Sequence, residues 1–146
     1  MDFFSSMNVS SSALAAERTR MNLISSNLAN ANTTRTPEGG PYKRKDAVFA
    51  ATPMEKPFSR ALDSATGQQV RQVKVSQIVE DQNPPRLQYD PSHPDADPQG
   101  YVAMPNVNVI EEMADMLTAS RAYEANVTAV QAAKNMALKT LDISSR

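Results

Sequence analysis

Apolar residues recur at helical spacing at both ends of the chain. In the N-terminal segment a column of residues spaced by seven consists of Met7, Leu14, Met21 and Leu28. Phe4, Ile24 and Ala31 each lie three residues from a member of this column. The C-terminal segment repeats the pattern with Met113, Ser120, Val127, Lys134 and Leu141 in one column and Leu117, Tyr123, Val130 and Leu138 beside it. Polar Ser120 and Lys134 weaken this second stripe, but both patterns predict an amphipathic helix.

Glycine and proline are confined to the middle of the chain. All four glycines and all ten prolines lie between Pro37 and Pro105. Because these residues interrupt helices more than any others, the distribution predicts an N-terminal axial helix over 1–36, a β and loop region over 37–105, and a C-terminal axial helix over 106–146. We expect the first helix to fray or stop between Asn30 and Thr36, and the two helices to form one helical core.

The central region carries short stretches of β-branched and aromatic residues. We predict strands within Tyr42–Ala51 and Gln69–Glu80, and shorter ones at RLQY and YVAM. The proline-rich YDPSHPDADPQG between the short ones predicts a loop. The fold class is therefore mainly α, with long terminal helices paired as a coiled-coil-like hairpin and a small irregular β-containing middle region.

The second helix has clear end signals. Asn108 followed by Glu111 resembles a capping box, and the acidic side chains of Glu111, Glu112 and Asp115 lie near the positive end of the helix dipole. These signals predict a helix that begins close to Asn108.

Composition and charge exclude several classes of protein. The 146 residues have a formal net charge of −1, which disfavours nucleic acid as a partner. There is no cysteine, so disulfides and thiolate metal sites are excluded. No run of 18 or more apolar residues exists, so we do not expect an integral membrane protein. The N-terminus lacks a cleavable secretory signal pattern, so export would need another route.

The candidates for chemistry are few. Asp90, His93, Asp95 and Asp97 cluster in one segment that imitates a calcium loop, but Asn106 stands where a bidentate glutamate is needed. A polar turn is the simpler interpretation. The single histidine supports neither a nucleophile relay nor a zinc triad without further partners. We therefore predict no enzyme activity, no catalytic, cofactor-binding or metal-binding residues, and no cofactor.

Burial is the main difficulty for a chain of this design. A helix of roughly 35 residues extends about 50 Å, which exceeds the width of a compact domain of this size. Two such helices bury one stripe each and leave other apolar positions exposed, so partners are expected to complete the burial. A monomeric bundle with one helix folded back remains the alternative.

Two separated motifs resemble the bacterial flagellar rod and hook proteins, the axial proteins of the flagellum. SNLANANT at 26–33 followed by YKR at 42–44 resembles their N-terminal signature, and NVNVIEEM at 106–113 running into ASRAYEAN at 119–126 resembles their C-terminal helix. TRTPEGGP, YDPSHPDADPQGYV and NVTAVQAAKNMALKTLDI are similar to the proximal-rod members. Thr128 stands where many rod and hook relatives carry lysine, which leaves the helix contacts there open.

The resemblance implies a structural subunit of the proximal rod of the basal body, which assembles helically through its terminal helices, transmits torque and surrounds the export channel. It implies partners among other copies of the chain, other rod proteins, a basal-body membrane-ring or adaptor protein, and the flagellar type III export apparatus. It also implies a periplasmic location reached without a cleaved signal peptide. The alternatives are a helical-hairpin adaptor or export chaperone of a type III secretion system and, less favoured by the residues, a small peptidoglycan-active enzyme.

The predicted subunit interface combines the two stripes with the asparagines that follow the first helix. Its residues are Met7, Leu14, Met21, Ile24, Asn27, Leu28, Asn30, Asn32, Met113, Leu117, Tyr123, Val127, Val130 and Leu141. The asparagines have two interpretations that the sequence leaves open. They either bond across subunits or satisfy backbone groups where their own helix ends.

Overall fold

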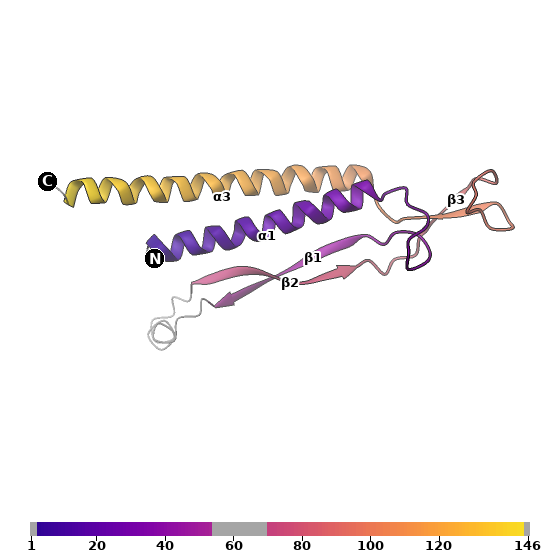
Figure 1. Ribbon diagram of the computed structural model, residues 1–146, viewed down its shortest axis with the longest axis horizontal. Helices are drawn as coiled ribbons and strands as arrows, with labels where there is room; N and C mark the ends of the chain where they lie inside the picture. The colour runs from indigo at the N-terminus through magenta and orange to yellow at the C-terminus, as the bar shows by residue number, and fades with distance from the viewer. Residues whose placement is uncertain (1–2, 54–69, 145–146) are drawn as a thin grey trace. The chain divides into compact units, whose positions relative to one another are not determined.

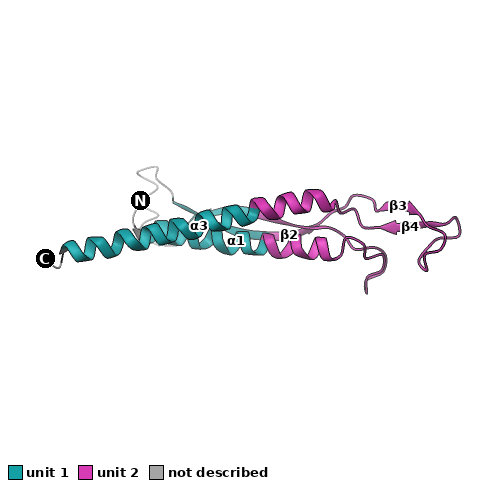
Figure 2. Cartoon of the chain, turned by 90° about the horizontal axis from the view of Figure 1, so that it is seen from above, with its two compact units in different colours: residues 1–19, 49–76, 119–146 teal, residues 20–48, 77–118 magenta. Residues whose placement is uncertain are grey.

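The computed structural model describes residues 3–53 and 70–144 (Figure 1). The chain divides into two compact units, coloured separately in Figure 2. Unit 1 comprises 1–19, 49–76 and 119–146, and unit 2 comprises 20–48 and 77–118.

The two predicted helices are present and begin and end close to the predicted positions. Helix α1 spans Phe3–Ala29 and helix α3 spans Val109–Ser144. Residues 30–32 form a turn after α1, so this helix ends one residue before the predicted interval. The Asn30 Nδ2 group donates to the Ser26 carbonyl at 2.9 Å, the same carbonyl that accepts the Asn30 backbone amide at 3.1 Å, so both bonds hold the last turn of the helix.

Helix α3 begins directly after Asn108, as the sequence predicts. The Asn108 Oδ1 atom accepts a hydrogen bond from the Ile110 amide at 3.2 Å, and its carbonyl accepts one from the Glu112 amide at 3.0 Å. An N-cap side chain can accept from the second or the third helical residue. The observed bond uses the second residue, whereas the predicted capping box would use Glu111, the third.

The middle region contains four strands among the described residues. Strands β1 (Lys45–Pro53) and β2 (Arg71–Glu80) form one two-stranded sheet, and their arrows run in opposite directions in Figure 1. Strands β3 (Arg86–Tyr89) and β4 (Tyr101–Met104) pair antiparallel in a second sheet. Residue 69 of the predicted second strand lies outside the described residues.

Strand β1 begins at Lys45, later than the predicted Tyr42. The reason is that the Tyr42 amide donates to the Thr33 carbonyl at 3.0 Å and closes the loop that follows α1. The proline-rich segment after β3 forms turns, as predicted. At its end Gly100 adopts a φ of 85°, a conformation that glycine tolerates and other residues rarely adopt.

Among the described residues the buried apolar side chains are few. In unit 2 they are Ile24, Ala31, Val102, Pro105 and Val107, and in unit 1 they are Ala16, Ala119 and Ala133. Larger apolar side chains such as Ile110, Leu117 and Leu141 are exposed instead. In the part of the chain that the structure describes, no helix has the length and hydropathy that a bilayer crossing requires.

Candidate subunit interface

The end of α1 is joined to β1 and to the start of α3 by one buried amide. Asn27 is 1% exposed, and its Nδ2 group donates to the Lys45 carbonyl at 2.9 Å and to Glu112 Oε2 at 3.1 Å. Its Oδ1 atom accepts from the Lys45 amide at 3.0 Å and from the Tyr42 hydroxyl at 3.0 Å. We call this group, Asn27 with Tyr42, Arg44, Lys45 and Glu112, the Asn27 node.

A buried carboxylate lies at the centre of the node. Glu112 is 1% exposed, and its Oε1 atom accepts a hydrogen bond from Arg44 Nε at 2.6 Å. The guanidinium also lies 3.4 Å from Asp46 and 3.9 Å from Asp115, measured between nitrogen and oxygen. A buried charge requires a partner with good geometry, because desolvation of an unpaired charge is costly. Glu112 has such a partner in Arg44.

The electrostatics of Arg44 follow from this geometry. Burial of the guanidinium lowers its pKa, but the hydrogen bond and the charge of Glu112, with a smaller contribution from Asp46, raise the pKa above its ordinary value. The geometry therefore favours the charged form of Arg44. A second ion pair, between Arg20 and Asp115 at 3.8 Å, links the same two helices within unit 2 and is more exposed.

The three asparagines of the predicted interface have different surroundings. Asn27 uses both its donors and its acceptor within one chain. Asn30 bonds to the Ser26 carbonyl and accepts a hydrogen bond from the Thr33 hydroxyl at 3.2 Å, so it serves the end of its own helix. The side chain of Asn32 is exposed. The local interpretation therefore accounts for Asn30, and a role of any of the three toward another subunit remains a prediction.

The predicted apolar interface residues divide into two groups by exposure. Ile24 is buried, and six others are half-buried: Leu14, Met21, Leu28, Tyr123, Val127 and Val130. The remaining four are exposed: Met7, Met113, Leu117 and Leu141. The seven-residue column that contains Met113, Val127 and Leu141 therefore does not have uniform burial. Whether these residues contact other subunits remains a prediction.

The first turns of α3 carry a continuous apolar surface. Ile110 is 80% exposed, Met113 56% and Leu117 61%, and the three residues follow the i, i+3, i+7 spacing of one helix face. We call them the α3 apolar face. Sequence reasoning selected Met113 and Leu117 but missed Ile110. The same spacing, started three residues earlier, would have found it.

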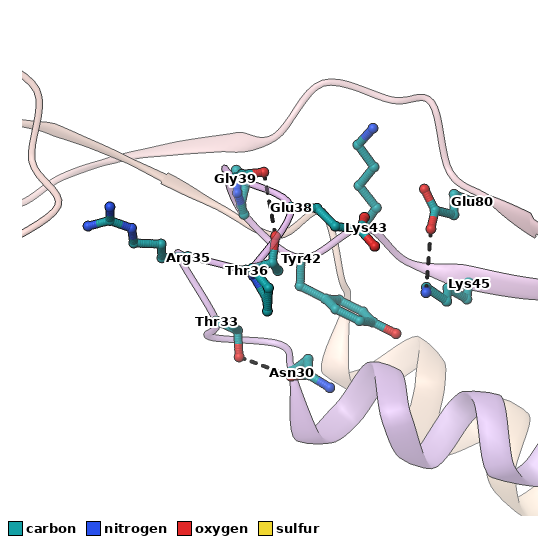
Figure 3. Close-up of a pocket in the computed structure, with 12 residues that line it drawn as sticks. Asn30, Thr33, Arg35, Thr36, Glu38, Gly39, Tyr42, Lys43, Lys45 and Glu80 are labelled. Atoms are coloured by element: carbon teal, nitrogen blue, oxygen red, sulfur yellow. Dashed lines mark hydrogen bonds and ion pairs between the residues drawn. The ribbon is translucent and has the colours of Figure 1, made fainter.

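The loop that follows α1 borders an open polar hollow, shown in Figure 3. Its polar groups largely bond to one another: the Thr36 hydroxyl donates to the Gly39 carbonyl, and Lys45 lies 3.4 Å from Glu80. Arg35 and Lys43 line the same hollow and are exposed. The basic run that begins at Lys43 is thus divided, because Lys43 faces this hollow whereas Arg44 belongs to the node.

The acidic loop before β4 is organised as a series of turns. Asp90 Oδ1 accepts from the Ser92 hydroxyl at 2.6 Å, Asp97 Oδ1 accepts from the Gln99 amide at 2.9 Å, and Asp95 Oδ2 accepts from the Thr34 hydroxyl at 2.8 Å. His93 Nδ1 accepts from the Asp95 amide. Asp90 and Asp97 are engaged in turns, as the polar-turn interpretation predicts, whereas Asp95 bonds to Thr34 in the loop after α1. Within the described residues no three acidic or histidine side chains are grouped for a metal.

Comparison with known sequences gives matches at both ends of the chain. The family described as "Flagella basal body rod protein" matches residues 7–35, and "Flagellar basal body rod FlgEFG protein C-terminal" matches residues 99–143. The flagellar basal-body rod protein FlgC of Borreliella burgdorferi is 46% identical, over 98% of both chains. FlgC of Bacillus subtilis is also 46% identical, over 98% of this chain and 99% of the relative. FlgC of Salmonella typhimurium is 43% identical over 93% of both.

Long helices that leave large apolar side chains exposed are typical of a structural subunit that assembles with other polypeptides. The matches specify which one: the chain belongs to the flagellar basal-body rod protein family, with FlgC relatives over nearly its whole length. It is a structural component of the basal-body rod and not an enzyme, as the sequence predicts. Rod proteins assemble with one another in the basal body, so an isolated adaptor or chaperone is not favoured.

Proposed function

We propose that this chain builds the proximal rod by helical assembly, with α1 and α3 paired in a coiled-coil-like layer around the export channel. Its neighbours are other copies of the chain and other rod proteins, and the assembly transmits torque. The observation that carries the proposal is the α3 apolar face. Its three side chains are more than half exposed, whereas the buried apolar side chains of the described residues include four alanines.

The size of these exposed side chains supports this proposal. Complete burial of an Ile, Met or Leu side chain contributes about 1.5–3 kcal/mol relative to exposure. A contiguous exposed face on a helix therefore favours contact with another polypeptide. Large apolar side chains are also exposed in the C-terminal part of α3, at Leu138, Leu141 and Ile143. Subunits that bury such faces against neighbours become stable only on assembly.

A charge placed on the α3 apolar face tests the proposed assembly. Leu117→Asp places a carboxylate among the side chains that are proposed to become buried, and an unpaired buried charge costs several kcal/mol. We expect loss of co-assembly with other rod proteins by sedimentation, and loss of swimming in a strain that carries only this variant. Thr118→Asp is the matched control, because Thr118 is the exposed neighbouring residue and receives the same charge. Normal assembly of the Leu117→Asp variant would refute the proposal.

The proposed route and location are export by the flagellar type III apparatus, without a cleaved signal, to the periplasmic part of the basal body. There a membrane-ring or adaptor protein contacts the assembled rod. The resemblance of both ends of the chain to flagellar axial proteins supports this route. Mass spectrometry of the subunit in purified basal bodies is expected to find the N-terminal segment of the gene product intact. A truncated N-terminus would contradict export without cleavage.

A further inference from the structure

The Asn27 node joins three segments that are far apart in the sequence. We propose that it fixes the axial register of α3 against α1 within unit 2, and with it the point at which β1 begins. This inference goes beyond the proposed assembly, because it concerns the conformation of a single chain. Its elements are the buried amide of Asn27, the buried carboxylate of Glu112, and the guanidinium of Arg44 that lies 2.6 Å from that carboxylate.

Apolar packing in unit 2 specifies the register of these helices weakly. Of the described residues of α1 and α3 that belong to unit 2, Ile24 is the one buried apolar side chain. The Arg20–Asp115 pair is about one-third exposed at each side chain, and exposed ion pairs contribute little. A slip of one turn, about 5.4 Å along the axis, would therefore cost little in apolar contact or in surface charge.

The node opposes such a slip. A displacement of about 5 Å would take the Glu112 carboxylate out of hydrogen-bond reach of both Asn27 and Arg44. Of the residues about one turn away, Asn108, Val109 and Met116 carry no charge, and the carboxylate of Asp115 stands on a side chain one methylene shorter than that of Glu112. The slipped state would then leave the buried carboxylate of Glu112 without both of its donors and the buried amide of Asn27 without its carboxylate partner. Buried polar groups that determine register are well documented in paired helices, often at a cost in stability.

Asn27 extends this control to the sheet. Its side chain bonds to both the amide and the carbonyl of Lys45, as the backbone of a neighbouring strand would. The first residue of β1 is therefore held at a set position on α1. The same amide donates to Glu112, so the side chain of Asn27 positions both the start of β1 and the start of α3.

A distance measurement in the full-length chain tests the proposal. The chain has no cysteine, so Asn22→Cys and Thr118→Cys introduce two unique sites for spin labels on exposed positions of α1 and α3 in unit 2. Electron-electron double resonance of the labelled parent is expected to give one narrow distance distribution. The Glu112→Gln variant is expected to broaden it, or to add a population displaced by about 5 Å, one helical turn.

A second variant separates register from folding. Glu112→Leu combined with Arg44→Met replaces the ion pair by apolar side chains, an exchange that buried pairs often tolerate without loss of stability. We expect this chain to fold with a mixed distance distribution. Asp115→Asn is the matched control, since it removes a more exposed carboxylate from the same helix, and the narrow distribution should persist.

Every outcome bears on the proposal. A single unchanged narrow distance in both node variants would overturn it, and so would a broad distribution in the parent chain or equal broadening in the Asp115→Asn control. The result is independent of the proposed function. If the parent chain shows the narrow distance but does not co-sediment with other rod proteins, the assembly proposal fails while the register proposal stands.

Discussion

Asn27 shows how much structure one side chain can organise. An amide offers two donors and an acceptor with two lone pairs, and Asn27 uses all four against a strand backbone, a tyrosine hydroxyl and a carboxylate. Aspartate at this position would lack the donors and would face Glu112 with a like charge. Asparagine, which has a poor helix propensity, therefore stands here for its hydrogen bonds.

Replacement of Asn27 should cost more stability than replacement of any other asparagine of the motif. Asn27→Ala removes four hydrogen bonds and leaves buried partners without a donor or acceptor, so we expect a loss of roughly 3 kcal/mol in the free energy of unfolding. Asn32→Ala is the control, because Asn32 is exposed, and it should change the value by no more than about 0.5 kcal/mol. Urea denaturation followed by circular dichroism measures both. Equal losses would contradict the buried role of Asn27.

The turn at Asp90 should depend on acid pH. The Ser92 hydroxyl and then the Ser92 amide donate to this carboxylate and lower its pKa below the ordinary value. Since the folded pKa is below the unfolded one, the stabilisation is complete above the unfolded pKa, near pH 4, and is lost as the pH falls through the folded value. An NMR titration should show the Ser92 amide shifting with the Asp90 carboxyl below pH 4. In the Ser92→Ala variant the Asp90 pKa should rise.

At the scale of elements, the ends of the helices are determined by short-range chemistry. Asn30, in the turn that follows α1, bonds to the Ser26 carbonyl through its backbone amide and its side chain, and Asn108 begins α3 through a bond to the Ile110 amide. The stripes between these ends predict that a helix forms, but they do not predict which of its faces becomes buried. Glu112 illustrates this limit, because its position in the first turn of α3 is typical of a solvated acidic residue, yet it is 1% exposed.

Removal of the cap should destabilise α3 by a limited amount. Asn108→Ala deletes the acceptor for the Ile110 amide, and such replacements typically cost about 1 kcal/mol. Asn108→Gly should cost only a few tenths of a kcal/mol, because glycine is itself accepted at N-caps. Thermal unfolding of both variants compares the two costs. A larger loss for glycine than for alanine would contradict the capping role.

The hairpin of β3 and β4 depends on Gly100. A Cβ atom there would lie 2.9 Å from the Tyr89 ring, and φ is 85°, so Gly100→Ala adds both a steric conflict and backbone strain. Gly39 has a φ of 89° but nothing within 4 Å of its Cβ position, so Gly39→Ala isolates the strain alone. We expect the Gly100 variant to lose more stability, by about 1–2 kcal/mol. Equal losses of stability for the two variants in denaturant titrations would show that the Tyr89 ring moves aside at no energetic cost.

At the scale of the whole molecule, the two units differ in what holds them. Unit 2 contains the Asn27 node, two buried valines and the Tyr89–Tyr101 ring pair, whose centroids lie 5.3 Å apart. The described residues of unit 1 bury alanines and leave Met136, Leu138 and Leu141 exposed. Little apolar burial in one chain is then available to offset the entropy of ordering the ends of the helices.

This difference predicts the exchange behaviour of the monomer. In dilute solution we expect amide hydrogens in 3–19 and 119–144 to exchange fast, and those around Asn27 and Glu112 to exchange more slowly. Assembly with rod partners should slow the first group, because neighbours then cover the exposed faces. Hydrogen exchange measured by mass spectrometry on monomer and assembly decides this. Slow exchange throughout both ends of the dilute monomer would contradict an order that depends on assembly.

The sequence by itself determined the elements of this protein and its family. Periodic apolar residues and the confinement of glycine and proline to 37–105 are local properties, so they predicted α1, α3 and the strands between them within a few residues. The motifs around Asn27 and Asn108 led to the rod proteins, and the matches confirm that family. The same motifs gave no means of separating a structural asparagine from one that binds a neighbour.

Only the tertiary structure decided which residues meet. Asn27, Arg44 and Glu112 are separated by up to 85 residues, and a bond between them depends on how the helices and β1 come together. The charge of Glu112 and the amide of Asn27 are visible in the sequence, but their burial is not. A glutamate in the first turn of a helix is stable in solvent, and only the tertiary contact with Arg44 shows that this one is buried. Local chemistry thus determines where the helices and strands form, and long-range contacts determine that Glu112 is the carboxylate that is buried.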